Sequence, residues 1–266
     1  VYTTLQPTLQ EAANSALRRA LTDYDQRHGY RGPESKVPLQ QQIDFDRLDQ
    51  ILNDAVVIGN LRPAFVIAVD DEEQTAQTYL GDGTQASLEL NDLKWARPYL
   101  SDNSLGPKIK KVSDVLSPGD LIRLSVKPTE PDQTDSLVKW RLAQIPEVAG
   151  AFVAMNPENG AILALVGGFD FLQSKFNRAT QAQRQAGSGL KPFIYSAALD
   201  NGFTAASLIN DAPVVFDDPS LENTWRPENY SGKFYGPTRL REALTYSRNL
   251  VSIRLLKEIG PAAGIS

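Results

Sequence analysis

The sequence contains no cysteine and only one histidine, His28, among its 266 residues. The absence of cysteine excludes disulfide bonds, thiol catalysis and cysteine-ligated metal ions. A single histidine argues against a Ser-His-Asp triad and against a histidine-rich zinc site. We interpret His28 as a hydrogen-bonded residue of a linker and expect neither a cofactor nor a bound metal ion.

Positive charge and long apolar segments are also scarce. The 27 lysines and arginines are outnumbered by 32 aspartates and glutamates, which gives a net charge of -5. Because nucleic-acid-binding surfaces normally need clustered lysine and arginine, we expect no nucleic-acid partner. There is no run of 18 or more apolar residues, no signal peptide and no initiator methionine, so the segment itself is expected to be soluble. The length indicates more than one domain.

The most informative motif is the sequence Ser-Gly-Leu-Lys at residues 188–191, which places a nucleophile and a potential base three residues apart. We predict a helix over 188–201, and residues three apart on a helix share a face. The positive end of the helix dipole would stabilise the anion that forms when Ser188 attacks a carbonyl. Burial lowers the pKa of a lysine, so a neutral Lys191 could accept the Ser188 proton. The pattern predicts acyl transfer.

This pattern alone is not specific, because residues 136–139 read Ser-Leu-Val-Lys. That copy lies in a stretch that alternates apolar and polar residues as strands do, and in a strand residues three apart point to opposite faces. The alternative for the first copy is that Ser188 caps a helix and Lys191 is a surface charge. A Ser-Asp-Asn sequence at 101–103 is interpreted as a turn.

Hydrophobic periodicity predicts an amphipathic helix over 4–24, a weaker helix over 44–58 and a series of short strands. The predicted strands are 65–69, 75–80, 86–90, 121–126 and 137–142, with residues 81–83 as a tight turn and the acidic run at 70–73 as a solvated hairpin turn rather than a calcium site. The apolar stretches 151–155 and 161–166 flank an Asn-Gly turn and predict a hairpin. Their near-continuous apolar character predicts that both faces of this hairpin are covered.

A second polar element, Ser247-Arg248-Asn249, lies between the amphipathic stretches 240–244 and 250–256. A loop between two helices can direct Ser247 and Asn249 into a cleft. Together with Ser188 and Lys191 it resembles the penicillin-binding proteins and serine beta-lactamases, whose motifs are Ser-x-x-Lys, Ser-x-Asn and Lys-Thr-Gly. Five further stretches make the chain similar, from end to end, to class A penicillin-binding proteins of Gram-negative bacteria: 1–5, 24–33, 95–99, 176–179 and 239–241.

The resemblance implies an α+β fold, in which a truncated penicillin-binding transpeptidase domain, itself similar to serine beta-lactamases, carries an inserted, small, all-β OB-like barrel. Residues 1–61 would form a helical linker that packs on the transpeptidase domain, 62–146 the OB-like docking domain, and 147–266 the N-terminal part of the transpeptidase domain. No Lys-Thr-Gly occurs in the chain. We therefore expect a fragment that lacks the third motif and is inactive alone, because a backbone donor to the oxyanion would be missing.

The resemblance also implies an activity, a peptidoglycan D,D-transpeptidase that acts through an acyl-serine intermediate and is a target of beta-lactams. Ser188 would attack the D-Ala-D-Ala stem peptide and Lys191 would be its base. Ser247 would relay a proton to the leaving amine, and Asn249 would hydrogen-bond the substrate's amide backbone. The alternatives are a D,D-carboxypeptidase, which uses water as acceptor, a serine beta-lactamase, whose second motif usually has Asp in place of Arg248, and a non-catalytic docking module.

Partners and location follow from the same resemblance. It implies a parent protein anchored in the inner membrane, with a glycosyltransferase domain upstream and this segment on the periplasmic face. It also implies that the OB-like domain is the docking site of an outer-membrane lipoprotein activator. Trp95, Tyr99 and residues 108–111 are candidates for that surface. The alternative is that these aromatic residues belong to the core and the lysines to a solvated loop.

Overall fold

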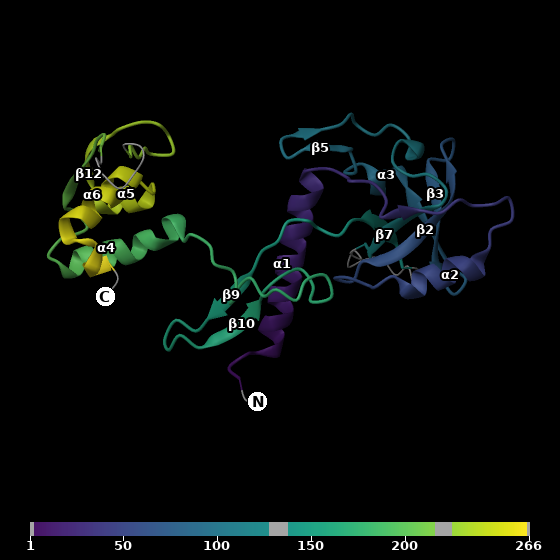
Figure 1. Cartoon of the computed structure of the whole chain (residues 1–266), viewed down its shortest axis with the longest axis horizontal. Coiled ribbons are helices and arrows are strands. Elements are labelled where there is room, and N and C mark those ends of the chain that lie inside the picture. Colours follow the sequence, from purple (N-terminus) through teal and green to yellow (C-terminus); the bar gives the residue numbers. More distant parts are fainter. Residues whose placement is uncertain (1–2, 128–137, 216–224, 265–266) are drawn as a thin grey trace, which may run out of the picture. The chain divides into compact units, whose positions relative to one another are not determined.

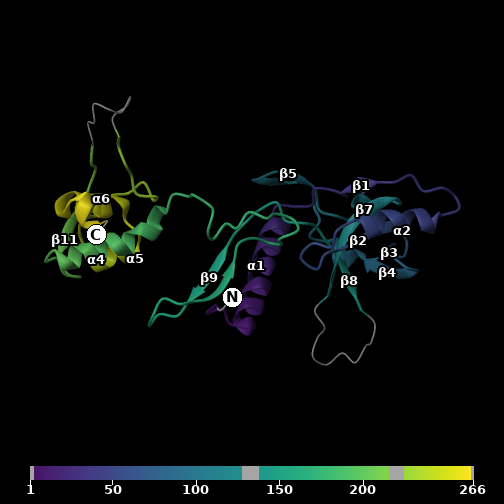
Figure 2. The same ribbon diagram turned by 60° about the horizontal axis from the view of Figure 1, so that its bottom comes forward.

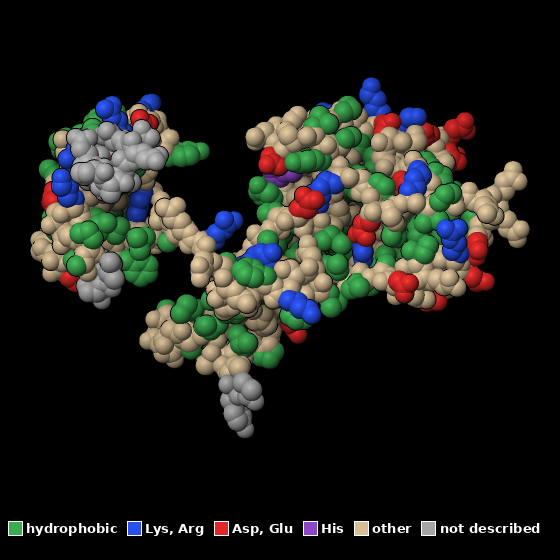
Figure 3. Space-filling view, viewed as in Figure 1, with side chains coloured by type: hydrophobic (Ala, Val, Ile, Leu, Met, Phe, Trp, Pro, Cys, Tyr) green, Lys and Arg blue, Asp and Glu red, His purple; other side chains and the backbone are tan. Residues whose placement is uncertain are grey.

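The structure is a computed structural model that describes residues 3–127, 138–215 and 225–264. The chain divides into two units, residues 1–182 and 183–266 (Figure 1). On the visible face of the first unit, acidic and basic side chains are interspersed, without a large field of one sign (Figure 3). Within the described ranges, no helix has the length and apolar character needed to cross a membrane.

The first unit begins with helix α1 (Pro7–Arg27), which starts at a proline, as first turns tolerate. Its buried residues Ala13, Leu17 and Leu21 recur every four positions and form one apolar face. This face packs against the antiparallel hairpin of β9 (Phe152–Met155) and β10 (Ile162–Val166), and the two views agree on that arrangement (Figures 1 and 2). The helix predicted over 4–24 is therefore present, with its bounds shifted by three residues.

The hairpin confirms the turn prediction but not the predicted burial. Asn156 and Gly160 close the turn, and Gly160 adopts a φ of 72°. The side of the sheet away from α1 is open in the described structure, where Val153 and Met155 are 45% and 56% exposed. The prediction that both faces are covered was wrong, because this sheet has two strands and α1 covers one face of it.

A six-stranded antiparallel sheet forms the rest of the first unit. Its strand order is β1-β7-β2-β3-β4, with β8 also paired to β7. The bounds are β1 (Ser35–Lys36), β2 (Arg62–Asp70), β3 (Thr75–Gly81), β4 (Thr84–Glu89), β7 (Asp120–Val126) and β8 (Trp140–Ala143). The described strands form an open path of hydrogen-bonded neighbours rather than a closed ring. All five predicted strand regions appear, although 137 lies outside the described residues.

Alternation along each strand produces two cores, one on each face of the sheet. Phe65, Tyr79 and Leu121 point toward α2 (Phe45–Asp54) and pack with its Leu48 and Leu52. Their strand neighbours form the larger core on the other face: Val66, Leu80, Leu88, Ile122, Leu124 and Leu142, with Leu93, Val112 and Leu116 from the connections. Helix α2 is shorter than the predicted 44–58, since the chain becomes extended at Ala55.

The remaining elements of the first unit are short. They are α3 (Leu90–Leu93), the hairpin of β5 (Tyr99–Ser101) and β6 (Ser104–Leu105), and the 3₁₀ turn η1 (Val112–Asp114). Residues 102–103 turn between β5 and β6, which confirms the turn predicted at 101–103. The turn at 81–83 is confirmed as well, with positive φ at all three residues. Of the second Ser-x-x-Lys sequence, residues 136 and 137 lie outside the described residues.

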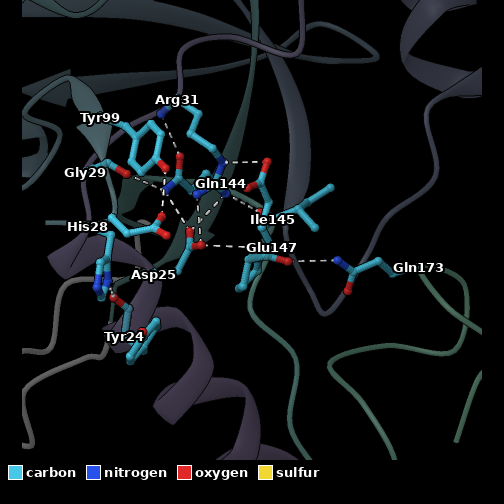
Figure 4. Close-up of polar contacts among 12 residues, drawn as sticks. Tyr24, Asp25, His28, Gly29, Arg31, Tyr99, Gln144, Ile145, Glu147 and Gln173 are labelled. Carbon is cyan, nitrogen blue, oxygen red and sulfur yellow. Dashed lines mark hydrogen bonds and ion pairs between the residues drawn. The ribbon is translucent and has the colours of Figure 1, made fainter. Parts of the chain in front are cut away.

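A buried acid on α1, Asp25, forms hydrogen bonds with residues that come before β1 and after β8 (Figure 4). Asp25 is 4% exposed and forms a forked ion pair with Arg31, at 2.9 and 3.1 Å. It also accepts hydrogen bonds from the Gln144 side chain at 2.7 Å and from the Glu147 backbone at 3.2 Å. Gln144 in turn accepts from the Arg31 backbone and donates to Gly29. We call Asp25, Arg31, Gln144 and Glu147 the Asp25 cluster.

Helices dominate the second unit. Its elements are the 3₁₀ turn η2 (Gly187–Leu190), α4 (Lys191–Asp200), the antiparallel pair β11 (Leu208–Asp211) and β12 (Gly236–Arg239), α5 (Leu240–Thr245), α6 (Asn249–Ile259) and the 3₁₀ turn η3 (Pro261–Gly264). The core joins α4 to α6 through Ile194, Ala198, Val251 and Leu255, with Leu240 and Ala243 of α5. The predicted helix at 188–201 is present as the continuous run of η2 and α4.

Candidate active site

Ser188 and Lys191 lie where η2 passes into α4. Ser188 is exposed within the 3₁₀ turn, whereas Lys191 opens the α-helix and is 7% exposed. The Lys191 backbone N–H donates to the Ser188 carbonyl, which closes this turn. Side chains three apart in a 3₁₀ turn eclipse one another, so both residues face the same side.

The loop between α5 and α6 brings Ser247 to the same place. Ser247 has a φ of 52°, in the left-handed region that residues with a Cβ rarely adopt. Such a conformation costs about 1–3 kcal/mol and persists where neighbouring contacts fix it. Here the Ser247 and Arg248 N–H groups donate to carbonyls of α5, at Leu244 and Ala243, with distances of 3.0 and 2.8 Å. This turn separates α5 from α6, which starts at Asn249, the last residue of the motif.

All four predicted site residues meet through hydrogen bonds. The Lys191 Nζ donates to the Ser247 carbonyl at 2.7 Å, the Ser247 Oγ at 2.9 Å and the Asn249 Oδ1 at 2.7 Å. The Ser247 Oγ donates to the Ser188 Oγ at 3.1 Å. Ser247 therefore connects the amine with the nucleophilic hydroxyl, and the three protons of the ammonium are all used.

The acceptors around Lys191 are neutral oxygens, and among the described residues no carboxylate pairs with it. Removal from water is the cause that lowers the pKa of Lys191 below its ordinary value. An amine with a lowered pKa is neutral in a larger fraction of molecules, and only the neutral form can accept a proton. The local environment suits Lys191 to act as a base.

A cavity of about 720 Å³ adjoins these side chains. Ser188, Lys191 and Asn249 line it on one side, and apolar residues that include Ile194, Trp225 and Leu256 line it elsewhere. A mostly apolar cavity with a few convergent polar groups is typical of a site for a small ligand or peptide. In the described parts of the chain, no group of three or more potential metal ligands lies close together.

Sequence reasoning missed the residues that support the Ser247 loop. Asn229 accepts a hydrogen bond from the start of α6, 20 residues away along the chain, and the buried Asp211 accepts one from Asn229. Arg248 is stacked on Tyr235, with the guanidinium carbon 3.4 Å from the ring centroid, and lies 5.2 Å from the Tyr246 ring. No periodicity or motif indicated these contacts, since they depend on how separate segments pack.

Comparison with known families identifies two successive matches. Residues 30–148 match the penicillin-binding protein OB-like domain, and residues 150–264 match the penicillin-binding protein transpeptidase domain. The chain is 48% identical over its whole length to penicillin-binding protein 1A of Pseudomonas aeruginosa, and covers 31% of that protein. It is 44% identical over 263 residues, 98% of the chain, to penicillin-binding protein 1A of Escherichia coli, and covers 30% of it.

A solved structure agrees with these matches. The crystal structure of penicillin-binding protein 1A from Haemophilus influenzae superposes with a TM-score of 0.81 at 34% identity, over 99% of this chain and 36% of that chain. The chain thus spans about a third of the length of the relatives it matches. The predicted α+β class, a transpeptidase domain with an OB-like domain, is confirmed, and the open sheet described above is compatible with it.

Proposed function

Because the chain belongs to the penicillin-binding proteins, we propose that it supplies the nucleophile and base of a peptidoglycan D,D-transpeptidase that beta-lactams also acylate. One observation carries the proposal: the hydrogen-bonded series from the Lys191 Nζ through the Ser247 Oγ to the Ser188 Oγ, beside a cavity. This series provides the nucleophile and the proton acceptor that acyl transfer to serine requires.

In the acylation step, Lys191 first loses a proton and becomes neutral, which its burial favours. The two hydrogen bonds of the series then reverse direction, so that Ser188 gives its proton to Ser247 and Ser247 gives its own to Lys191. The Ser188 Oγ bonds to the carbonyl carbon of the penultimate D-Ala. As the C–N bond breaks, the proton passes back through Ser247 to the amine of the departing D-Ala. An amine from a neighbouring peptidoglycan strand then bonds to the acyl carbon, the bond from that carbon to the Ser188 Oγ breaks, and the proton that the amine loses restores the Ser188 hydroxyl through Ser247 and Lys191.

Asn249 contacts the base and can also contact the substrate. Its Oδ1 accepts from Lys191, and its Nδ2 donates to the Glu228 carbonyl at 2.9 Å. The second Nδ2 proton can donate to an amide carbonyl of the bound peptide, which is the role the motif predicts. The Ser188 N–H supplies one donor for the oxyanion. We propose that a second donor comes from outside this chain, so that the 266 residues alone are not acylated; loss of one such donor typically costs about 10²- to 10³-fold.

The test is intact mass after incubation with benzylpenicillin. It compares the 266-residue chain, a version extended to the length of its relatives, and the extended Ser188→Ala variant. We expect an adduct of one drug molecule on the extended protein alone. Ser196→Ala is the matched control, because Ser196 is an exposed serine on the same helix. A folded extended protein without an adduct would overturn the enzyme proposal and leave a docking module.

Two alternatives within serine acyl transfer differ in the acceptor. A D,D-carboxypeptidase or a beta-lactamase passes the acyl group to water, whereas the transpeptidase passes it to an amine. Incubating the extended protein with a D-Ala-D-Ala peptide and an amine acceptor separates them. Transpeptidation yields the cross-linked dimer, and an exclusively hydrolysed product would favour the carboxypeptidase.

The proposal extends to the domains and their surroundings. We propose residues 1–61 as the linker, 62–146 as the OB-like docking domain and 147–266 as part of the transpeptidase domain, in a parent protein anchored in the inner membrane with this segment in the periplasm. The docking domain would bind an outer-membrane lipoprotein activator. Deleting residues 63–145 should then abolish the activator's effect while penicillin acylation stays largely intact. Loss of acylation in a folded deletion variant would contradict this division.

The contacts of Trp95 and Tyr99 distinguish which of these two candidates is available to bind the activator. The Trp95 ring packs edge-on against the buried Tyr30 at 5.8 Å, and its indole N–H donates to Leu142 at 3.3 Å, which supports a core role. Tyr99 is 38% exposed and donates to Asp102 on the β5–β6 hairpin. We therefore propose that Tyr99, rather than Trp95, contacts the activator. Tyr99→Ala should weaken stimulation by the activator and leave basal acylation unchanged.

A further inference from the structure

We propose that Asn229, oriented by the buried carboxylate of Asp211, is a positioning residue for Asn249 and, through Asn249, for Lys191. The inference rests on the proposed function, because it concerns how the same site is held. Asn229 lies outside the two motifs and is 5% exposed. Its side chain is placed between the start of α6 and the end of β11.

The first step concerns the orientation of the Asn249 amide. An asparagine amide has a donor end and an acceptor end, and Lys191 needs the acceptor end. The Asn249 Nδ2 donates to the Glu228 carbonyl at 2.9 Å, so the Oδ1 faces Lys191 at 2.7 Å. The dipeptide Glu228-Asn229 therefore contacts Asn249 twice, once through the Glu228 carbonyl and once through the Asn229 side chain.

The second step concerns the backbone of Asn249. The first N–H groups of a helix have no partner within the helix and need an acceptor. The residue before α6 is Arg248, whose side chain makes no capping hydrogen bond. The Asn229 Oδ1 takes that role from another segment, accepting from the Asn249 N–H at 2.8 Å and the Leu250 N–H at 3.4 Å. Asn229 thus fixes the position at which α6 begins.

The third step concerns what orients Asn229. Asp211 at the end of β11 is fully buried, and both of its carboxylate oxygens accept from the Asn229 Nδ2, at 2.7 and 3.0 Å. The same Nδ2 donates to the Lys233 carbonyl at 2.9 Å. Because these oxygens attract only the donor end of the amide, the Oδ1 must point to α6. A buried carboxylate is costly unless it is hydrogen-bonded, so the pair favours this single arrangement of Asn229.

One readout needs no catalytic activity. In the 266-residue chain, Asn229→Ala removes the acceptor of the Asn249 N–H, and we expect hydrogen exchange of that amide, followed by NMR, to accelerate at least about tenfold. Asn201→Ala is the matched control, because Asn201 also loses one side-chain hydrogen bond, to Ala197 at 2.8 Å, at the far end of α4. In the Asn201→Ala variant, the hydrogen-exchange rate of the Asn249 amide should equal that of the unsubstituted chain.

The second readout is the rate of penicillin acylation in the extended protein. Misplacing a reacting group by about 1 Å can cost 10²-fold, and we expect Asn229→Ala to lower the acylation rate by about 10- to 100-fold. Asn229→Asp keeps the shape but sets a carboxyl against Asp211, so it should be as slow. The double variant Asp211→Asn, Asn229→Asp restores a donor facing an acceptor between these two side chains but leaves the Lys233 carbonyl without its donor, so it should recover part of the rate.

The outcomes separate this inference from the proposed function. No acylation of the extended, unsubstituted protein would overturn the proposed function, while the exchange measurement would still test Asn229. Normal exchange at Asn249 in Asn229→Ala, or a normal acylation rate in a folded Asn229 variant, would overturn the positioning role. A double variant whose melting temperature recovers while its acylation rate does not would do the same, because the restored donor–acceptor pair would then not position the site.

Discussion

Two of the buried charged side chains, one in each unit, have opposite surroundings. Asp25, in the first unit, is 4% exposed and faces the forked guanidinium of Arg31. Lys191, in the second unit, is 7% exposed and faces only neutral oxygens, from Ser247 and Asn249. The acid is neutralised by an opposite charge, whereas the base is surrounded by dipoles alone.

This difference separates a structural charge from a chemical one. A buried ion pair with all its hydrogen bonds made resists change, because removing either partner leaves the other uncompensated. A buried ammonium group without a counter-ion is less stable than one in water. It therefore loses its proton more readily, and the pKa of Lys191 is lowered. The comparison predicts that substitutions at Asp25 affect stability, and that substitutions at Lys191 affect chemistry.

The largest expected effect is on acylation by Lys191→Ala. Removing a general base typically lowers a rate by about 10²- to 10⁴-fold, and no ion pair is broken, so the melting temperature should change little. The measurement is the penicillin acylation rate of the extended protein beside its thermal melt. Lys257→Ala on the exposed side of α6 serves as the control. Strong destabilisation with normal acylation would refute Lys191 as the base.

The next effect is on stability, from Asp25→Ala. Breaking a buried ion pair by removing one partner costs about 3–5 kcal/mol, here because Arg31 and Gln144 lose their acceptor. Denaturant unfolding followed by Trp95 and Trp140 fluorescence, in a Trp225→Phe background, reports on the first unit. Asp23→Ala, an exposed acid on the same helix, should be nearly neutral. Equal stabilities of the Asp25 and Asp23 variants would contradict a structural role of the Asp25 ion pair.

Arg31→Lys should have a smaller effect. Lysine keeps the charge but not the fork, and it cannot also donate to the Ile145 carbonyl, which Arg31 reaches at 2.8 Å. Loss of a hydrogen bond to a charged group costs about 1.5–3 kcal/mol. The same unfolding assay measures it, and a variant as stable as the unsubstituted chain would show that charge alone holds the cluster.

The smallest effect is the pH dependence of stability that Lys191 adds. Its pKa in the folded chain lies below the ordinary 10.5, so between these two values the unfolded chain binds more protons. The free energy of unfolding should therefore rise with pH across that window, relative to Lys191→Met, and the burial penalty should be fully present below it. Parallel stability curves for the two proteins would show that burial does not perturb Lys191.

Much of the fold was predictable because it depends on local patterns. Alternating residues such as Phe65 and Val66 point to opposite faces of the sheet, and the strand predictions followed from that alternation. The spacing of Ser188 and Lys191 likewise placed them on one side of a helical run. The open face of the β9–β10 hairpin was not predictable, because apolar residues alone do not tell how many elements cover a strand.

The finer geometry of the site depends on contacts between distant segments. Ser247 connects Lys191 to Ser188 only because its backbone adopts a left-handed conformation, which the residues Ser-Arg-Asn do not indicate. Asn229 reaches the start of α6 from 20 residues away. The boundaries at 61/62 and 146/147 stay predictions.

The Asp25 cluster has a consequence for the order in which the chain folds. Asp25 and Gln144 are 119 residues apart in sequence, and contacts of such separation form slowly because a long loop must close first. During synthesis α1 leaves the ribosome well before Gln144 is added to the chain. The Asp25 carboxylate therefore remains hydrated while the sheet between Asp25 and Gln144 in the sequence assembles. The hydrogen bond between Asp25 and Gln144 therefore requires that the sheet has already brought its two ends together.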